Sequence, residues 1–440
     1  KVLYFLILSV QIDNFLGEMD FISKIGAKFF IYLYISYSKL STYCFYFIYG
    51  LLFLVTTQLI VTLCLICINN FDCFEVINVT PNTGVCLMIL VKYGKIHKNK
   101  KVYDEIFKHF RFDLWETIAD TVEHKSILNQ YTQTTRFIVR FDFYYAIGLT
   151  IVVDLFPRII MIYQHNTRIV GEEKQYLYPF DGWYPFDKQQ WYNTAYIWES
   201  FMTTVVIFLF VFINILHISV TRYICMELEI LGSTMEGLIT DDDVVKIKEG
   251  IEIEQTHYKI KNKLKFIISK HQFLAKIISD LDNVLGDGMF LTYAFGSVFI
   301  CLTAFTATVV DDFYKSTRYF SFFCSLLLEV FIQCIMGQLL SDHSNKLEKA
   351  IYFADWVFAD SDTKKMLLIF LMRVQKPFEF SAKGYKNMNL EAFSEVCTYY
   401  NSMNKSICIM YDLKEKSLAA AFATQYCFTN KHESDTLMII

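Results

Sequence analysis

The sequence predicts an all-α membrane protein with seven transmembrane helices, a cytosolic amino terminus and an extracellular carboxyl terminus. Composition is the first reason: 54% of the 440 residues are hydrophobic and 20% are charged, which excludes an ordinary soluble enzyme. The second is that lysine and arginine are absent from residues 40–91, 189–221 and 277–314. The third is that the basic residues gather in alternate connections between the apolar runs.

Each expected span contains about 20 mostly apolar residues, the length that crosses the hydrocarbon core of a bilayer. The expected spans, in order, are Thr42–Ile68, a second between the acidic turn Asn69–Glu75 and Val91, Phe137–Tyr163, Tyr196–Val220, Met289–Val310, Tyr319–Leu340 and Leu390–Tyr411. Charged residues interrupt the third span, and the seventh is the most polar of the set.

The connections after the second, fourth and sixth expected spans carry most of the lysines and arginines. By the positive-inside rule these connections face the cytosol, an orientation opposite to that of G-protein-coupled receptors. The predicted organisation is a cytosolic arm (1–40), a six-span bundle with an outer ligand pocket (41–342) that includes cytosolic helices (224–285), cytosolic anchor helices (343–389), the seventh span (390–411) and a tail (412–440).

An apolar stripe precedes the fifth span. Its members, separated by alternating steps of four and three, are Ile260, Leu264, Ile267, His271, Leu274, Ile278 and Leu281. This heptad pattern predicts a helix that leaves the membrane and packs on a partner surface, either within the chain or on another subunit. We interpret His271 as a packed or interface residue rather than a metal ligand, since no second ligand lies at helical spacing. Trp356 belongs to a further cytosolic helix with an aromatic face.

Two polar pairs lie within the expected spans. Glu329 occurs in the middle of the sixth span, and Gln333 follows it by one helical turn on the same face. A carboxylate at this depth indicates either a functional site or a structural hydrogen-bonded group. Asp154 and Arg158 are also four residues apart, which predicts a structural pair on one face of the third span.

The seventh span has one polar face, formed by Ser394, Thr398, Asn401 and Lys405. A helix that is polar on one side must bury that side in protein or place it against water. Repeated around a symmetric oligomer, this face would line a pore, and within a monomer it would form a polar packing seam.

Aromatic residues in the outer halves of the spans predict an apolar ligand pocket with few polar groups. The candidate ligand-binding residues are Tyr145, Leu149, Phe201, Met202, Thr203, Phe295, Ser297 and Phe323. Aromatic side chains at these positions also suit contact with lipid. Because no phosphate-binding glycine loop, zinc motif or nucleophile elbow occurs, we expect no enzymatic activity, cofactor or metal site.

Two stretches of the chain carry distinctive residue motifs. The first is the run from Tyr178 to Asp187, which is similar to the outer loop before the fourth span in insect odorant receptors. The second is the carboxyl third, with Gln333, Cys334, Gly337, Leu340-Ser341, Ala350-Ile351-Tyr352, Trp356, Pro377, Ala382-Lys383 and Asn389–Phe393. The pair Asn401-Ser402 departs from the Tyr-Ser pair that is usual in the family's seventh span.

The resemblance implies an odorant-tuned subunit of a nonselective cation channel, assembled as a tetramer with the shared odorant co-receptor in the plasma membrane of olfactory dendrites. It further implies that the outer bundle binds a small volatile ligand, that the cytosolic helices anchor the subunits, and that the seventh span lines the pore, without a G protein or nucleic acid. The alternatives are a gustatory receptor and a small-solute transporter. The gustatory signature fails after Thr398-Tyr399, and inverted repeats typical of transporters are not found.

Overall fold

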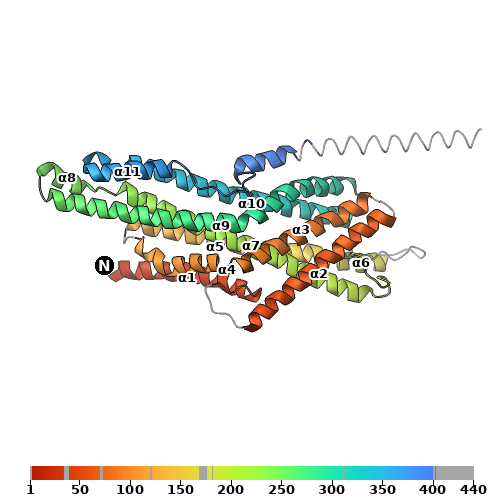
Figure 1. Cartoon of the computed structure of the whole chain (residues 1–440). Helices are drawn as coiled ribbons and strands as arrows, with labels where there is room; N and C mark the ends of the chain where they lie inside the picture. Colours follow the sequence, from red (N-terminus) through yellow and green to blue (C-terminus); the bar gives the residue numbers. More distant parts are fainter. Residues whose placement is uncertain are drawn as a thin grey trace, which may run out of the picture.

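The computed structural model describes residues 2–33, 39–69, 73–118, 121–167, 176–180, 182–310, 313–399 and 402. Regular structure within these residues is helical, apart from one isolated bridge between Ser381 and Asn387. The elements form an elongated bundle (Figure 1). They are α1 (Val2–Lys28), α2 (Lys39–Asn69), α3 (Cys73–Lys98), α4 (Lys100–Lys108), η1 (His109–Asp113), η2 (Leu114–Glu116), α5 (Val122–Thr150), η3 (Ile151–Leu155), α6 (Phe156–Thr167), α7 (Tyr192–Glu236), α8 (Asp241–Glu249), α9 (Ile253–Val309), α10 (Phe313–Tyr352), η4 (Trp356–Phe358) and α11 (Ser361–Val374).

Among the described residues, six helical segments are long and apolar enough to cross a membrane. Five of the first six predicted spans fall within one of these segments, and the other, Met289–Val310, extends past the end of its segment by two residues, so the predictions are confirmed at the level of the helices. A further helical run begins at Leu390 and continues to Tyr399, the start of the seventh predicted span. The rest of that span and the predicted tail at 412–440 lie outside the described residues, apart from Ser402.

Two helices extend far beyond the thickness of a bilayer. With 45 and 57 residues, α7 and α9 are about 68 and 86 Å long, against about 30 Å for a hydrocarbon core. Their extensions pass alongside α10 and α11 at one end of the bundle, which we call the α11 end (Figure 1). The opposite end, where α6 lies, is called the α6 end.

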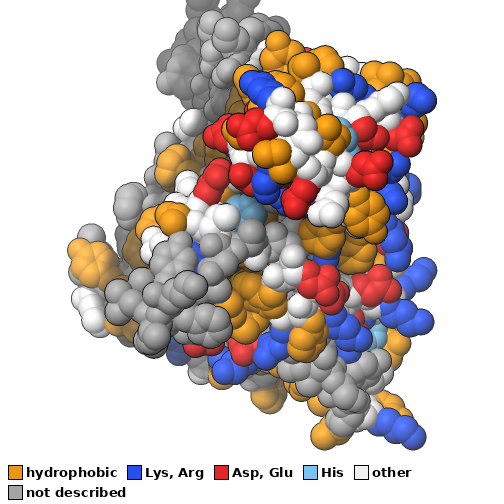
Figure 2. Space-filling model, turned by 90° about the vertical axis from the view of Figure 1, so that its left-hand side faces the viewer, with side chains coloured by type: hydrophobic (Ala, Val, Ile, Leu, Met, Phe, Trp, Pro, Cys, Tyr) orange, Lys and Arg blue, Asp and Glu red, His pale blue; other side chains and the backbone are white. Residues whose placement is uncertain are grey.

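The connections that are rich in lysine meet at the α11 end. Lys261 of α9 pairs with Asp362 of α11 at 3.2 Å, and Lys270 of α9 pairs with Glu116 of η2 at 3.2 Å. Figure 2 looks onto this end and shows basic and acidic side chains interspersed with apolar ones. The carboxyl ends of α2, α6 and α9 and the amino ends of α3, α7 and α10 lie at the α6 end (Figure 1). Connections that are rich in lysine and arginine therefore lie at one end of the bundle and those that are poor in them at the other, as the sequence predicts.

Local sequence signals mark the helix ends at the α11 end. Thr240 and Asp243 form a reciprocal capping box at the start of α8, which satisfies backbone donors that the helix itself leaves free. Gly250 ends the same helix with a φ of 77°, a left-handed conformation that costs glycine little. The side chain of Thr121 accepts a hydrogen bond from the backbone of His124 and caps α5 in the same way.

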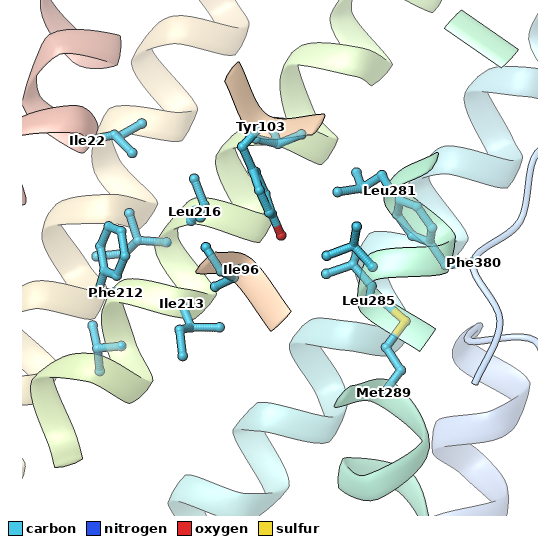
Figure 3. Packing of buried hydrophobic residues seen from close by; sticks show 14 of the residues in the cluster. Ile22, Ile96, Tyr103, Phe212, Ile213, Leu216, Leu281, Leu285, Met289 and Phe380 are labelled. Atoms are coloured by element: carbon cyan, nitrogen blue, oxygen red, sulfur yellow. The ribbon is translucent and has the colours of Figure 1, made fainter. Parts of the chain in front are cut away.

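The largest apolar core joins helices that are distant in sequence. Ile96 of α3, Tyr103 of α4, and Ile213 and Leu216 of α7 face Leu281, Leu285 and Met289 of α9 (Figure 3). The predicted amino-terminal arm contributes to this core, since Phe15 and Ile22 of α1 are fully buried. α1 packs on α5 and α7, so the arm is an integral layer of the bundle.

The heptad stripe of α9 begins in a second apolar core at the α11 end. All seven of its residues are buried within the single chain, with exposed fractions of 3% or less. Ile260, Leu264 and Ile267 pack with residues of α7, α10 and α11. The rings of Phe370 and Phe378 lie 5.1 and 5.2 Å from the imidazole of His271. The stripe is therefore covered by helices of the same chain, the first of the two alternatives, and its role in anchoring another subunit stays a prediction.

Candidate ligand cavity and polar network

An apolar cavity lies between α2, α3, α5, α7 and α10, and we call it the inner cavity. It contains about 730 Å³ of empty space, including its mouth. Its lining is formed by Val55, Leu59, Asn82, Val85, Cys86, Leu149, Val153, Pro179, Phe180, Met202, Thr203, Val206, Ile207, Phe210, Phe322, Ser325 and Leu326. Such a lining suits a small apolar molecule.

The few polar side chains of the inner cavity already have partners in the protein. Thr203 donates from its hydroxyl to the carbonyl of Glu199 at 2.8 Å, and the hydroxyl of Ser325 donates to the carbonyl of Ser321 at 2.8 Å. Asn82 likewise donates to a carbonyl of its own helix at 3.3 Å. Because these bonds turn the donors back to the backbone, the cavity selects mainly by shape and apolar contact.

The structure brings together only part of the predicted ligand set. Leu149, Met202 and Thr203 line the inner cavity. Tyr145 lies beside it, since its hydroxyl and that of Ser325 are 2.5 Å apart. The remaining four, Phe201, Phe295, Ser297 and Phe323, are not part of the lining. Two of them, Phe201 and Phe295, are 52% and 44% exposed, because their helix faces point away from the bundle.

Sequence reasoning missed the contribution of the loop before α7. Pro179 and Phe180 close the inner cavity from the α6 end, and they belong to the stretch that resembles the outer loop of odorant receptors. That motif could have pointed to a role of the loop in the cavity. Hydropathy alone does not show that a loop folds back into the bundle. Val55 and Leu59 of α2 were also missed, since nothing in an evenly apolar helix marks the face that turns inward.

Glu329 is the centre of a buried polar network. Its carboxylate accepts hydrogen bonds from Lys92 at 2.6 Å, from Gln333 at 2.7 Å and from Asn214. Lys92 is 6% exposed and Glu329 1% exposed. The pair to Gln333 was predicted, whereas Lys92 was assigned to a cytosolic connection and instead lies inside α3. The ammonium of Lys92 and the amides of Gln333 and Asn214 together compensate the carboxylate of Glu329 for the loss of water.

The predicted pair between Asp154 and Arg158 does not form. Asp154 lies on η3, and its carboxylate accepts from the hydroxyl of Thr204 at 2.8 Å. The guanidinium of Arg158 lies 5.1 Å from the ring of Tyr196 and donates to Asn193 at 3.3 Å. The reason is the π-helical turn, which changes the angular spacing on which the four-residue rule depends.

α10 connects the inner cavity to the start of the seventh helix. Ser325 and Leu326 line the cavity, whereas the ring of Phe331, on the same helix, lies 5.2 Å from that of Phe393. Gly337 allows a close approach, since a Cβ atom at this position would lie 1.8 Å from the carbonyl oxygen of Met388. The same helix therefore contacts both the cavity and the seventh span.

The segment before the seventh helix is held against α9. Asp282 accepts from the backbone of Ser381 at 2.7 Å, and Asp287 pairs with Lys383 at 2.9 Å. The hydrogen bond to Asp287 raises the pKa of Lys383. These contacts fix the position from which the seventh helix departs.

The described part of the seventh helix turns its predicted polar face outward. Ser394 and Thr398 are exposed, while Ala392 and Val396 are buried against the bundle. Asn401 and Lys405, the other two predicted pore-lining residues, lie outside the described residues. Trp356, the remaining predicted anchor residue, is 43% exposed at the α11 end.

Together, these features define a multi-pass α-helical membrane protein with an apolar cavity inside the bundle. The family model described as "7tm Odorant receptor" matches residues 72–399, well over half of the chain. The chain belongs to this odorant receptor family, a family of receptors rather than enzymes.

Individual relatives are similar over part of their length. Odorant receptor 85f of Drosophila melanogaster is 27% identical over 130 residues, which are 30% of this chain and 33% of that protein. Odorant receptor 49a of the same organism is 30% identical over 137 residues, 30% of this chain and 33% of that protein. The odorant receptor coreceptor of Anopheles gambiae is 23% identical over 139 residues, 31% of this chain and 29% of that protein. The chain thus aligns with about a third of the length of these relatives.

A solved structure shares the fold. The insect olfactory receptor OR5 from Machilis hrabei in complex with eugenol superposes with a TM-score of 0.76 at 15% identity, covering 90% of this chain and 100% of that one. At this identity the likeness concerns the fold alone. The all-helical fold of insect olfactory receptors expected from the resemblance is therefore confirmed, with six apolar segments of membrane-spanning length among the described residues.

Proposed function

We propose that the chain is an odorant-tuned subunit of a ligand-gated, nonselective cation channel. The inner cavity carries this proposal, because it is apolar, lies within the bundle and shares α10 with the seventh helix. A small volatile molecule in the cavity would contact Leu326 and Phe322 of α10 directly. Movement of α10 would then act on the seventh helix through Phe393 and Met388.

The ligand is proposed to be small and largely apolar. Leu149, Met202 and Thr203, together with Phe180 and Phe210, would form most of its contacts. Tyr145 would act indirectly, by fixing the hydroxyl of Ser325. Phe201, Phe295, Ser297 and Phe323 have no direct role in this proposal, since they lie outside the lining.

The α11 end is proposed to face the cytosol, with the amino terminus inside and the carboxyl terminus outside. The collected lysines and arginines of this end support that orientation, because basic residues are retained on the cytosolic side of a membrane. The family suggests the plasma membrane of an olfactory sensory dendrite as the location.

Assembly with co-receptor subunits, as a tetramer, is proposed to use an exposed apolar surface at the α11 end. We call this surface the anchor patch, and it consists of Tyr352, Phe353, Trp356, Val357, Leu368, Ile369 and Met372. Their exposed fractions lie between 43% and 74%, which is unusual for so many large apolar residues in one region. The buried stripe of α9 would support the patch from behind, through its packing with α10 and α11.

The pore is proposed to be lined by the exposed face of the seventh helix, which begins with Ser394 and Thr398. Four such faces around a central axis would surround a polar path, while Val396 keeps each helix attached to its own bundle.

Co-expression with an insect odorant co-receptor tests the whole proposal. A panel of volatiles that begins with eugenol should include molecules that evoke a cation current in cells with both subunits and none in cells with the co-receptor alone. Saturable uptake of solute without current would instead indicate a transporter. Current from the chain by itself would contradict the requirement for the co-receptor.

A further inference from the structure

The loop before α7 separates the inner cavity from a second hollow, which we call the outer groove. The outer groove contains about 980 Å³ of empty space, including its open side. Its lining comes from α2 (Leu54, Thr57, Gln58 and Val61), the loop (Trp183, Tyr184, Pro185 and Phe186) and α7 (Thr194, Ala195 and Trp198). Pro179 and Phe180 of the same loop face the inner cavity. One short loop thus has an apolar hollow on each side.

The loop is held in place by a fully buried carboxylate. Glu199 accepts hydrogen bonds from the backbone nitrogens of Phe180 and Gly182, at 3.1 and 3.3 Å. It also accepts from the hydroxyl of Tyr184 at 3.2 Å. Buried charged acceptors with several donors make rigid attachments. The loop is therefore a formed wall between the two hollows.

Residues within one turn of α2 line both hollows. On α2, Val55 and Leu59 face the inner cavity, while the intervening Gln58 faces the outer groove. The amide of Gln58 donates to the carbonyl of Trp183 at 3.0 Å, and the indole of Trp198 donates to Gln58 at 3.4 Å. Gln58 thereby links α2, the loop and α7 at the boundary.

Gly182 shows how close the boundary groups are. A Cβ atom at this position would lie 2.9 Å from the amide nitrogen of Gln58 and 3.0 Å from the ring of Phe180. The glycine lets a residue of the groove boundary and a residue of the cavity lining meet. These two side chains therefore lie at the point where the two hollows come nearest to one residue of the loop.

The outer groove opens sideways, on the surface of an apolar helix. Leu54 and Val61 of α2 are 50% and 41% exposed, and Trp183 and Phe186 of the loop are 47% and 41% exposed. α2 is long and apolar enough to cross a membrane, so we expect this surface to face the acyl chains of a bilayer. Apolar small molecules concentrate in that environment because water excludes them.

We propose that the outer groove is a second binding site for the same small apolar ligands, from which they pass to the inner cavity when Gln58 and Phe180 rotate. This inference rests on the proposed function of the inner cavity. It adds a lateral route from the membrane and gives Trp183, Trp198 and Gln58 a role in access. The position of the two hollows on either side of one wall is the observation that favours a ligand over a fixed acyl chain or a second subunit.

Direct binding is tested with bromobenzene, a small apolar molecule whose heavy atom quenches tryptophan. The full chain is placed in nanodiscs of unbrominated phosphatidylcholine, and the signal of Trp183 is taken as the difference from the Trp183→Phe variant. We expect saturable quenching that disappears when Val61→Phe and Thr194→Phe fill the outer groove. The matched control pair, Ile60→Phe and Ile197→Phe, places the same rings on exposed positions of the same helices outside both hollows and should retain it.

The proposed site would be refuted if the quenching were not saturable, or if both pairs of variants lost it equally. Quenching by brominated acyl chains that bromobenzene does not displace would show that lipid occupies the groove, and would also overturn it. These outcomes do not depend on channel activity, so they are distinct from a failure of the proposed function.

Channel kinetics test the route in cells that also express the co-receptor. Filling the outer groove should slow both activation and deactivation by about three- to tenfold while the half-maximal concentration stays within about twofold. This pattern is expected because an obstacle on a path slows passage equally in both directions. Unchanged rates would refute the route. If Val206→Phe, inside the cavity, also left the half-maximal concentration unchanged, the assignment of the inner cavity itself would fail.

Discussion

The ammonium of Lys92 lies 2.6 Å from the carboxylate of Glu329, and both groups are buried inside the transmembrane bundle. The two residues are far apart in sequence, and they join α3 to α10. The ring of Phe210, which lines the inner cavity, is 5.9 Å from the same ammonium. The ion pair therefore lies next to the proposed ligand site, on the helix that leads to the seventh span.

Breaking this pair from one side should be costly. We expect Lys92→Met to destabilise the chain by about 3–5 kcal/mol, because the carboxylate of Glu329 would remain buried without its counter-charge. The double variant with Glu329→Gln should lose less than the sum of the single variants. Thermal unfolding of the purified chain in detergent measures the difference, and strict additivity would argue against direct coupling of the two groups.

The heptad stripe is buried within the chain and the anchor patch is exposed, so substitutions can test the two surfaces separately. Leu264→Ala should lower the stability of the chain alone by about 2–5 kcal/mol, because it leaves a hole in a fully buried core. The exposed Leu368→Ser should change that stability by about 0.5 kcal/mol or less. It should instead weaken co-purification with the co-receptor. The anchor patch would be contradicted if Leu368→Ser co-purified normally with the co-receptor while Leu264→Ala folded but failed to co-purify.

Gly337 should be required for docking of the seventh helix. Gly337→Ala would place a methyl group against the carbonyl of Met388, so we expect loss of evoked current together with a lower unfolding temperature. Gly296→Ala, on α9, is the matched control. Its Cβ atom would lie 3.4 Å from Val330, so the variant should behave like the parent or gain slightly from better helix propensity. Equal evoked currents and unfolding temperatures in the two variants would contradict the special role of Gly337.

Filling the inner cavity should change ligand sensitivity selectively. Val206→Phe adds a ring to the lining, and we expect the half-maximal concentration of a good agonist to rise about tenfold, through overpacking of about 1–3 kcal/mol. Phe201→Leu alters the neighbouring exposed face of α7 and should leave the concentration within about twofold. Dose–response curves of whole-cell current provide the measurement. A larger effect from Phe201→Leu would place the ligand elsewhere.

The outward face of the seventh helix should be accessible to water-borne reagents. In the open channel, Thr398→Cys should react with a charged methanethiosulfonate and the current should fall, since Thr398 lies on the exposed polar face. Val396→Cys should not react at a comparable rate, because Val396 is 3% exposed against the bundle. Equal reaction rates at the two positions, measured by perfused block of current, would contradict a pore lined by this face.

Hydropathy and the placement of basic residues were enough for the class of protein and for six of its helices. These signals are local: a run of apolar residues must find an apolar environment, and lysines near its ends limit its length. The heptad steps of α9 were also read correctly as a packing face. The same steps could not distinguish a partner within the chain from one outside it, because apolar periodicity does not name the surface that covers it.

The sequence by itself determined the apolar helices, their alternation between two ends of the bundle and the polar face of the seventh helix. Tertiary structure alone decided that Lys92 meets Glu329, that a π-helical turn separates Asp154 from Arg158, and that Pro179 and Phe180 close the inner cavity. The physical reason is the range of the interactions. Helix formation and membrane insertion depend on neighbours within a few turns, whereas a cavity and a buried ion pair exist only where several helices cross.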